Sequence, residues 1–79
     1  MKKVVIYTTR YCAYCAAAKQ LLRSKKVEFE EMDVTNDDAM REKLVQMTGG
    51  RETVPQIFVE GRSIGGYDEL VRDFKRIFS

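Results

Sequence analysis

Apolar residues recur along the chain with two spacings, one typical of strands and one typical of helices. The apolar run at 4–8 is short and rich in β-branched residues, which predicts a buried strand with both faces covered. From Tyr14 to Leu22 the apolar residues follow a helical spacing, and this pattern fades at Ser24. The run at 27–34 predicts a second strand, although its apolar side chains do not all fall on one face.

Capping residues and glycines divide the second half of the chain in the same way. Residues 35–38 offer helix-capping side chains, and the apolar stripe after them predicts a second helix that ends at a pair of glycines. Two short strands are predicted at 56–59 and 62–64, joined by a tight hairpin, with Pro55 at the start of the first. The closing helix has one apolar face, made of Tyr67, Leu70, Val71, Phe74, Ile77 and Phe78.

The predicted order of elements is β-α-β-α-β-β-α. A strand-helix-strand start implies a parallel pair of strands with a right-handed crossover, and the hairpin adds an antiparallel pair. The 79 residues are 44% hydrophobic and 33% charged, which is the composition of an ordinary globular domain. We therefore expect an α/β fold in which helices flank a four-stranded mixed sheet, and a single domain over residues 1–79.

Charge and hydropathy argue against two classes of partner. The chain has 14 basic and 12 acidic residues without a basic block, and it has no Trp, so nucleic acid is not an expected partner. The first apolar run is too short for a signal peptide, and no segment approaches the roughly 20 apolar residues that span a bilayer. We expect a monomer that works in the cytoplasm and not at a membrane. In that compartment a cysteine pair is more often catalytic or metal-binding than structural.

The only two cysteines, Cys12 and Cys15, lie three apart where the first strand gives way to the first helix. Cys12 is expected in the first turn of this helix, where unpaired N–H groups and the helix dipole favour a thiolate over a thiol. Arg10 could add a positive charge nearby. Cys15, flanked by Tyr14 and Ala16, is expected to be more buried and less ionised. The pair would then divide into an attacking thiol and a resolving thiol.

Three other interpretations of the cysteine pair compete with redox chemistry. A structural disulfide would close a loop too short to add much stability. Half of a zinc site would need a dimer to complete it, because the chain has no His and no third Cys. The cysteines could also be small core residues. The strand-helix-strand context around the Cys-x-x-Cys motif favours redox chemistry.

From about Lys3 to Phe78 the chain resembles the glutaredoxins. Three motifs in order carry the resemblance: Cys12-Ala13-Tyr14-Cys15 after the first strand, Thr53-Val54-Pro55 before the third strand, and Gly65-Gly66-Tyr67-Asp68 at the start of the last helix. The resemblance implies a thioredoxin-like fold and glutathione as reductant and co-substrate, without a tightly bound cofactor. It implies disulfide-containing or glutathionylated proteins as the other partners.

The resemblance also implies a role for each matching residue. Cys12 matches the nucleophile of the family, and Cys15 matches its resolving thiol. The Thr53-Val54-Pro55 stretch is similar to a loop with a cis proline, where the Val54 backbone would pair with the cysteine of glutathione.

The remaining matches concern the two ends of glutathione. Tyr67 and Asp68 match positions that hold the γ-glutamyl end, through backbone N–H groups at a helix start and through the Asp side chain. Arg51 lies where relatives carry a basic or polar residue that could face the glycine carboxylate. The full set of predicted glutathione-binding residues is Arg10, Tyr14, Arg51, Thr53, Val54, Pro55, Gly66, Tyr67 and Asp68.

The chain departs from the family pattern at two positions. Ala13 stands where the commonest motif has Pro, which would preset the first helical residue. Thr9 stands where relatives commonly carry Lys, and Arg10 could substitute for it from the next position.

Two alternative functions follow from the resemblance. Glutaredoxins without the proline include some that bind a 2Fe-2S cluster between two subunits, with glutathione completing the ligand set. Cys12 would be the protein ligand of such a cluster carrier. The second alternative is an electron donor reduced by thioredoxin reductase. The intact glutathione motifs and the absence of Trp near the C-terminus favour glutathione as the reductant.

Overall fold

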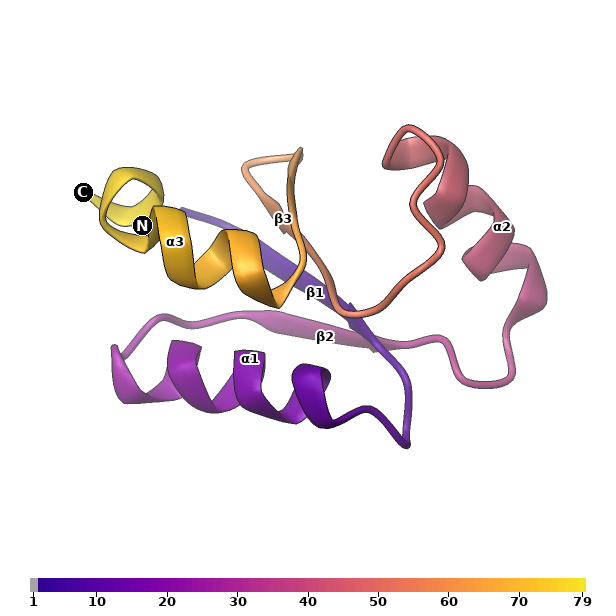
Figure 1. Cartoon of the computed structure of the whole chain (residues 1–79), viewed down its shortest axis with the longest axis horizontal. Coiled ribbons are helices and arrows are strands. Elements are labelled where there is room, and N and C mark those ends of the chain that lie inside the picture. Colours follow the sequence, from indigo (N-terminus) through magenta and orange to yellow (C-terminus); the bar gives the residue numbers. More distant parts are fainter. Residues whose placement is uncertain (1) are drawn as a thin grey trace.

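The computed structural model describes residues 2–79, and its elements follow the order that the sequence predicts. In chain order they are β1 (Val4–Thr8), α1 (Ala13–Ser24), β2 (Glu30–Asp33), α2 (Asp38–Met47), β3 (Gln56–Val59), β4 (Arg62–Gly65) and α3 (Tyr67–Phe78) (Figure 1). None of the helices in residues 2–79 is long and apolar enough to cross a membrane.

The four strands form one mixed sheet in the order β2-β1-β3-β4. β1 runs parallel to β2, with Val5 opposite Glu30, and antiparallel to β3. β3 and β4 form the predicted hairpin, whose turn residues Glu60 and Gly61 have φ values of 52° and 79°. Positive φ at both positions is the geometry of a two-residue turn that matches the twist of its strands. The sheet is therefore the mixed, thioredoxin-like sheet that we expected.

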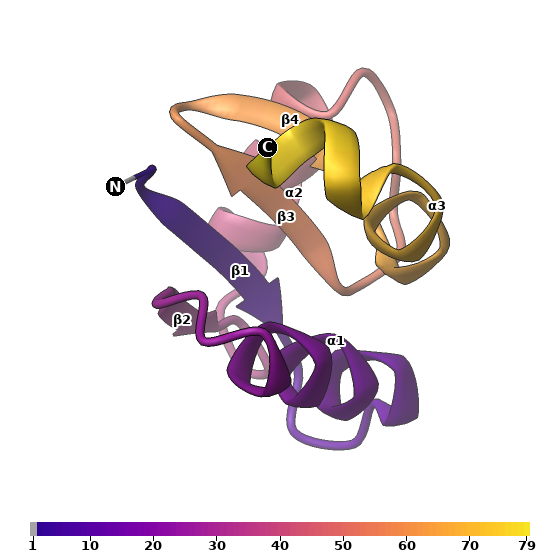
Figure 2. The same ribbon diagram turned by 90° about the vertical axis from the view of Figure 1, so that its left-hand side faces the viewer.

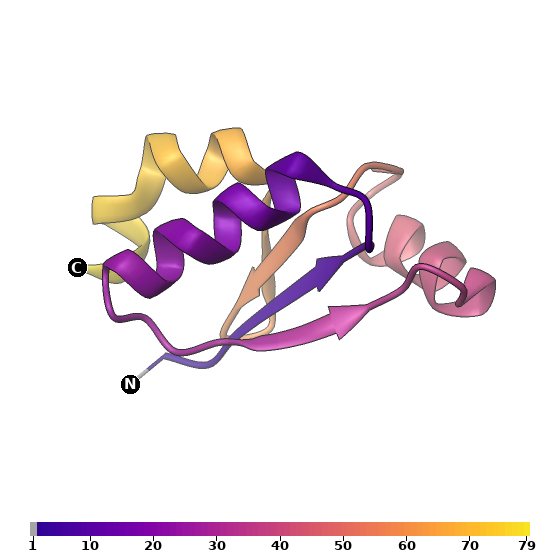
Figure 3. The ribbon, with the colours of Figure 1, turned by 90° about the horizontal axis from the view of Figure 1, so that it is seen from below.

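The helices are distributed unevenly over the sheet. α1 and α3 lie on one side of it, and α2 lies beyond the carboxyl end of β2 (Figure 3). α1 is next to β1 and β2, whereas α3 is next to β3 and β4 (Figure 2). The main core forms between these two helices and the sheet, and its buried residues are Val4, Ile6, Ala18, Leu22, Ile57, Val59 and Leu70.

Three details differ from the expectation. β1 is fully buried only at alternate residues, because the face opposite α1 and α3 is incompletely covered. β2 begins at Glu30, because the chain pairs with β1 only from Glu30 onward. It is an edge strand, and all four of its side chains are exposed. Val71 is 50% exposed, although we predicted it on the apolar face of α3. It follows Leu70, which is fully buried, and successive residues on a helix point about 100° apart.

Candidate active site

Cys12 is the N-cap of α1, one position earlier than the first-turn placement expected from the sequence. Its sulfur accepts a hydrogen bond from the Cys15 N–H at 3.0 Å. The N-cap position is usually occupied by Ser, Thr, Asp or Asn, whose side-chain oxygens accept this bond. Here a sulfur atom takes that place. The same sulfur is half-buried and donates to the Val54 carbonyl at 3.6 Å.

Cys15 lies inside the helix and is buried, with 1% of its surface exposed. Both cysteines are free thiols. Burial first, and then the hydrogen bond and the charge of Cys12, raise the pKa of Cys15 from 9.0 to about 12. The two thiols therefore have different environments: Cys12 is half-buried at a helix terminus, and Cys15 is buried inside the helix.

The loop between α2 and β3 lies against Cys12. Its Val54–Pro55 bond is cis, and Pro55 precedes β3 rather than beginning it. The buried Gln56 side chain donates to the Thr53 carbonyl at 2.8 Å and so ties the loop to the start of β3. The structure thus brings the second predicted motif to the cysteine pair.

The third motif reaches the same end of the sheet. Gly66 is the N-cap of α3, and Tyr67 and Asp68 begin the helix. The centroids of the Tyr67 and Tyr14 rings are 5.8 Å apart, with an angle of 36° between the ring planes, so the first turns of α1 and α3 are in contact. Asp68 is exposed. Tyr11, just before Cys12, is exposed as well.

Arg51 makes an ion pair that the sequence does not predict. Its Nη1 lies 3.1 Å from Oε1 of Glu69, in the first turn of α3. Arg51 also lines a cavity of about 360 Å³ together with Arg41, Val54 and other residues of α2 and the loop. Glu42 and Glu52 line the same cavity, so residues of both charges surround it next to Val54.

Arg10 contacts the segment that follows β2. Its backbone N–H donates to Thr35 Oγ1 at 2.7 Å. Hydrogen bonds from Thr35, and to a smaller extent the charge of Arg10, hold the pKa of Asp33 below its ordinary value. The Arg10 charge thus acts on an acid at the end of β2.

Three residues of this site were missed by sequence reasoning: Arg41, Gln56 and Glu69. Arg41 and Glu69 lie on amphipathic helices, where the sequence does not distinguish a functional charged residue from an ordinary solvent-exposed one. Gln56 carried a weak signal, because a polar residue directly after Pro55 opens an otherwise apolar strand.

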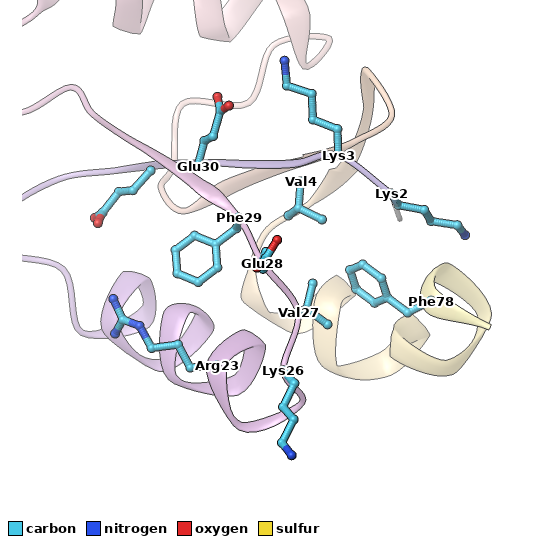
Figure 4. Close-up of a pocket in the computed structure, with 11 residues that line it drawn as sticks. Lys2, Lys3, Val4, Arg23, Lys26, Val27, Glu28, Phe29, Glu30 and Phe78 are labelled. Carbon is cyan, nitrogen blue, oxygen red and sulfur yellow. The ribbon is translucent and has the colours of Figure 1, made fainter.

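A larger cavity, of about 1230 Å³, opens at the start of β1 and is therefore remote from the cysteine pair (Figure 4). Val4, Val27, Phe29 and Phe78 contribute its apolar part. Among residues 2–79, no three or more His, Cys, Asp or Glu side chains are grouped to hold a metal ion.

A family model described as Glutaredoxin matches residues 4–64, which include both cysteines and the cis-proline loop. The chain belongs to the glutaredoxin family. Glutaredoxin 3 of Escherichia coli strain K12 is 47% identical to it over 70 residues, which cover 89% of this chain and 83% of that relative. As a glutaredoxin, the protein is a thiol-disulfide oxidoreductase with a thioredoxin-like fold.

Solved glutaredoxin structures agree with this one in fold. Glutaredoxin 1 from Francisella tularensis, in complex with cacodylate, superimposes with a TM-score of 0.86 at 31% identity, covering 98% of this chain and 96% of that one. A buckwheat glutaredoxin-glutathione complex has a TM-score of 0.86 at 28% identity, covering 95% of this chain and 70% of that one.

Proposed function

We propose that this glutaredoxin depends on glutathione and reduces both protein disulfides and glutathione-protein mixed disulfides. The observation that supports this most directly is the position of Cys12, whose sulfur lies between the Cys15 N–H and the Val54 carbonyl. A sulfur at this place borders the loop on which an extended glutathione would pair. The relative from buckwheat was crystallised as a complex with glutathione.

Glutathione would be held at three points. Its cysteine would pair with the Val54 backbone next to Cys12. Its γ-glutamyl carboxylate would accept from the first N–H groups of α3, at Tyr67 and Asp68, which have no acceptor within the helix. Its glycine carboxylate would lie on the Arg41 and Arg51 side of the cavity, away from Glu42 and Glu52.

The first reaction is deglutathionylation, and Cys12 alone carries it. The Cys12 thiolate attacks the glutathione sulfur of a mixed disulfide, a Cys12-glutathione bond forms, and the protein thiolate leaves and takes up a proton. The thiolate of a second glutathione then attacks the glutathione sulfur on Cys12. Glutathione disulfide leaves, and the Cys12 thiolate returns. The Cys15 N–H stabilises negative charge on Cys12 before and after each exchange.

Reduction of a protein disulfide uses both cysteines. Cys12 first forms a mixed disulfide with the substrate, which removes the negative charge and the hydrogen bond that oppose ionisation of Cys15. Cys15 then loses its proton and attacks the Cys12 sulfur, the Cys12–Cys15 disulfide forms, and the substrate sulfur leaves as a thiolate that takes up a proton. Two glutathione molecules then reduce the Cys12–Cys15 disulfide and leave as glutathione disulfide. Mixed-disulfide formation itself thus makes the buried thiol easier to ionise at the step that needs it.

A coupled assay with glutathione, glutathione reductase, NADPH and a small glutathione mixed disulfide tests this proposal. The wild-type protein and the Cys15→Ser variant should both turn over this substrate, whereas only the wild type should reduce a protein disulfide. Turnover with thioredoxin reductase, and none with glutathione, would show that the protein is instead an electron donor reduced by thioredoxin reductase. A coloured dimer after anaerobic reconstitution with iron, sulfide and glutathione would support the 2Fe-2S carrier instead.

We also propose that the protein acts as a monomer in the cytoplasm, where a cysteine pair is more often catalytic than structural. A sizing column run with the reduced protein tests the monomer, and fractionation of the source cells tests the location.

A further inference from the structure

Glu69 joins the start of α3 to the loop before β3. Its Oε1 atom accepts a hydrogen bond from the Gly66 N–H at 2.6 Å and another from Arg51 Nη1 at 3.1 Å. The hydrogen bond from Gly66, followed by the Arg51 guanidinium, lowers the pKa of Glu69 below its ordinary value. The side chain is therefore a carboxylate at neutral pH, and it serves a helix terminus and a loop at once.

The contact between loop and helix is closely packed. A Cβ atom added at Gly65 would lie 2.4 Å from Glu69 Oε1, so the Glu69 side chain lies directly over the Gly65 backbone. A Cβ atom at Gly66 would lie 3.1 Å from the Pro55 carbonyl oxygen and 3.8 Å from Arg51 Nη2. The absence of side chains at both glycines lets the loop approach the helix, and the ion pair bridges the two.

The proposed glutathione site is divided between the two elements that Glu69 joins. Val54 belongs to the loop, whereas Tyr67 and Asp68 belong to α3. We propose that Glu69 is a positioning residue: through Arg51 it sets the distance between the Val54 backbone and the first turn of α3, and so controls affinity for glutathione-containing substrates without touching them. This inference rests on the proposed glutathione-dependent function.

Two roles for Arg51 predict opposite effects when the Glu69 charge is removed. If the ion pair holds the loop in place, its loss weakens the binding of glutathione. If Glu69 only neutralises Arg51, its loss frees the guanidinium for a substrate carboxylate and strengthens binding. The close packing at Gly65 and Gly66 favours the first role.

Two substitutions separate the functions of the carboxylate. Glu69→Gln keeps an oxygen that can accept from the Gly66 N–H but removes the charge that holds Arg51. We expect E69Q to raise the KM for a small glutathione mixed disulfide about two- to fivefold, the range for a partly exposed ion pair, with kcat little changed. Glu69→Ala removes both interactions, and its KM should rise roughly tenfold.

The partner and an independent ion pair supply the controls. Arg51→Met removes the other half of the bridge, so the effects of E69Q and R51M on KM should be less than additive in the double variant. Asp73→Asn breaks an ion pair with Arg72 and Arg76 on the same helix, and its KM should stay at the wild-type value. Reduction of insulin with dithiothreitol as reductant uses the cysteine pair without glutathione, and E69Q should perform it at the wild-type rate.

The outcomes that would contradict this inference are as definite as those that would support it. A KM for E69Q at or below that of an active wild type overturns the positioning role, and so do additive effects with R51M. If E69Q lost as much activity in insulin reduction as in the glutathione assay, the defect would be a general structural one, and the positioning role would also be overturned. Should E69A fail to fold, the E69Q result stands alone. A wild type that has no glutathione-dependent turnover would overturn the proposed function instead.

Discussion

The first turns of α1 and α3 meet at one end of the sheet, where the Tyr14 and Tyr67 rings are in contact, but their N–H groups are satisfied differently. α1 is capped by the sulfur of Cys12 and has no acidic residue in its first turn. α3 has glycine at its N-cap, and the Glu69 carboxylate reaches back to the N–H of that glycine.

This difference distinguishes the start of α1, which holds the reactive sulfur, from the start of α3, which is held by an ion pair. At α1 the helix dipole acts on an atom whose charge must change in every catalytic cycle, and an acidic neighbour would oppose the thiolate. At α3 the Glu69 carboxylate accepts from the Gly66 N–H and holds Arg51. The N–H groups of Tyr67 and Asp68 have no acceptor within the helix, and we propose that a ligand carboxylate binds them. One helix start is thus suited to chemistry and the other to binding.

The largest effect is expected when the sulfur of Cys12 is replaced by oxygen. Ser is a good N-cap, so Cys12→Ser should change the free energy of unfolding by no more than about 0.5 kcal/mol. All thiol-disulfide exchange should be lost, because a hydroxyl forms no mixed disulfide. Urea unfolding and the coupled glutathione assay measure the two quantities.

The start of α2 provides the matched control. Asp37 caps this helix by accepting from the Met40 N–H at 3.0 Å, outside the cysteine site. Asp37→Ala should lower the free energy of unfolding by about 1 kcal/mol and leave turnover unchanged. Glutathione-dependent activity in the Cys12→Ser variant would contradict a chemical role for the α1 cap.

Disruption of the start of α3 should reduce stability, in addition to the effect on glutathione affinity that displacement of Glu69 should have. Gly65 has a φ of +107°, and a methyl group there would collide with Glu69. Gly65→Ala should lower the free energy of unfolding by roughly 2–3 kcal/mol, through backbone strain and displacement of Glu69. At Gly49, where φ is +73° and no atom lies within 4 Å of an added Cβ, the same change should cost only about 1 kcal/mol. Equal losses in urea unfolding at the two sites would show that contact with Glu69 contributes nothing.

The buried thiol of Cys15 should make stability depend on alkaline pH. Its pKa is about 12 in the folded protein, above the ordinary value of 9.0. Between these values the unfolded chain has lost the proton and the folded chain still holds it. The free energy of unfolding therefore falls as pH rises above 9.0, with a slope of up to about 1.4 kcal/mol per pH unit from this group.

Urea unfolding from about pH 8 to about pH 11, compared between wild type and Cys15→Ala, isolates this effect from the other titrating groups. The stability advantage of the wild type should shrink across that interval. A difference between the two proteins that does not vary with pH would contradict the burial argument.

The smallest effect concerns the residue that departs from the family motif. Ala13 is the first residue of α1, where an N–H has no partner within the helix and Pro is well tolerated. Ala13→Pro should raise the free energy of unfolding by about 0.5 kcal/mol. The same change at Ala17, inside the helix, should cost about 3 kcal/mol or more. A loss of stability in Ala13→Pro would show that the Ala13 N–H has a partner in the folded protein.

The elements that were predicted well are those with strong local signals. The periodic apolar residues of α1 and α3, and the Asp and Gly residues around α2, mark their ends because capping depends on a few neighbouring residues. β2 was predicted three residues too early, since Val27 and Phe29 pack on the core from the segment before the strand. Val71 was misplaced because an apolar residue at the edge of a helical stripe can face solvent.

Local pattern alone was enough to indicate the order of the elements, the cysteine pair at a strand-to-helix junction, and the two other motifs, because each depends on residues close together in the chain. Side-chain contacts between separate elements became visible only in the folded protein. Arg51 meets Glu69 18 residues away, and Arg41 joins Arg51 beside Val54. Periodicity and capping carry no information about such pairs, because packing of the loop against α3 and α2 brings them together.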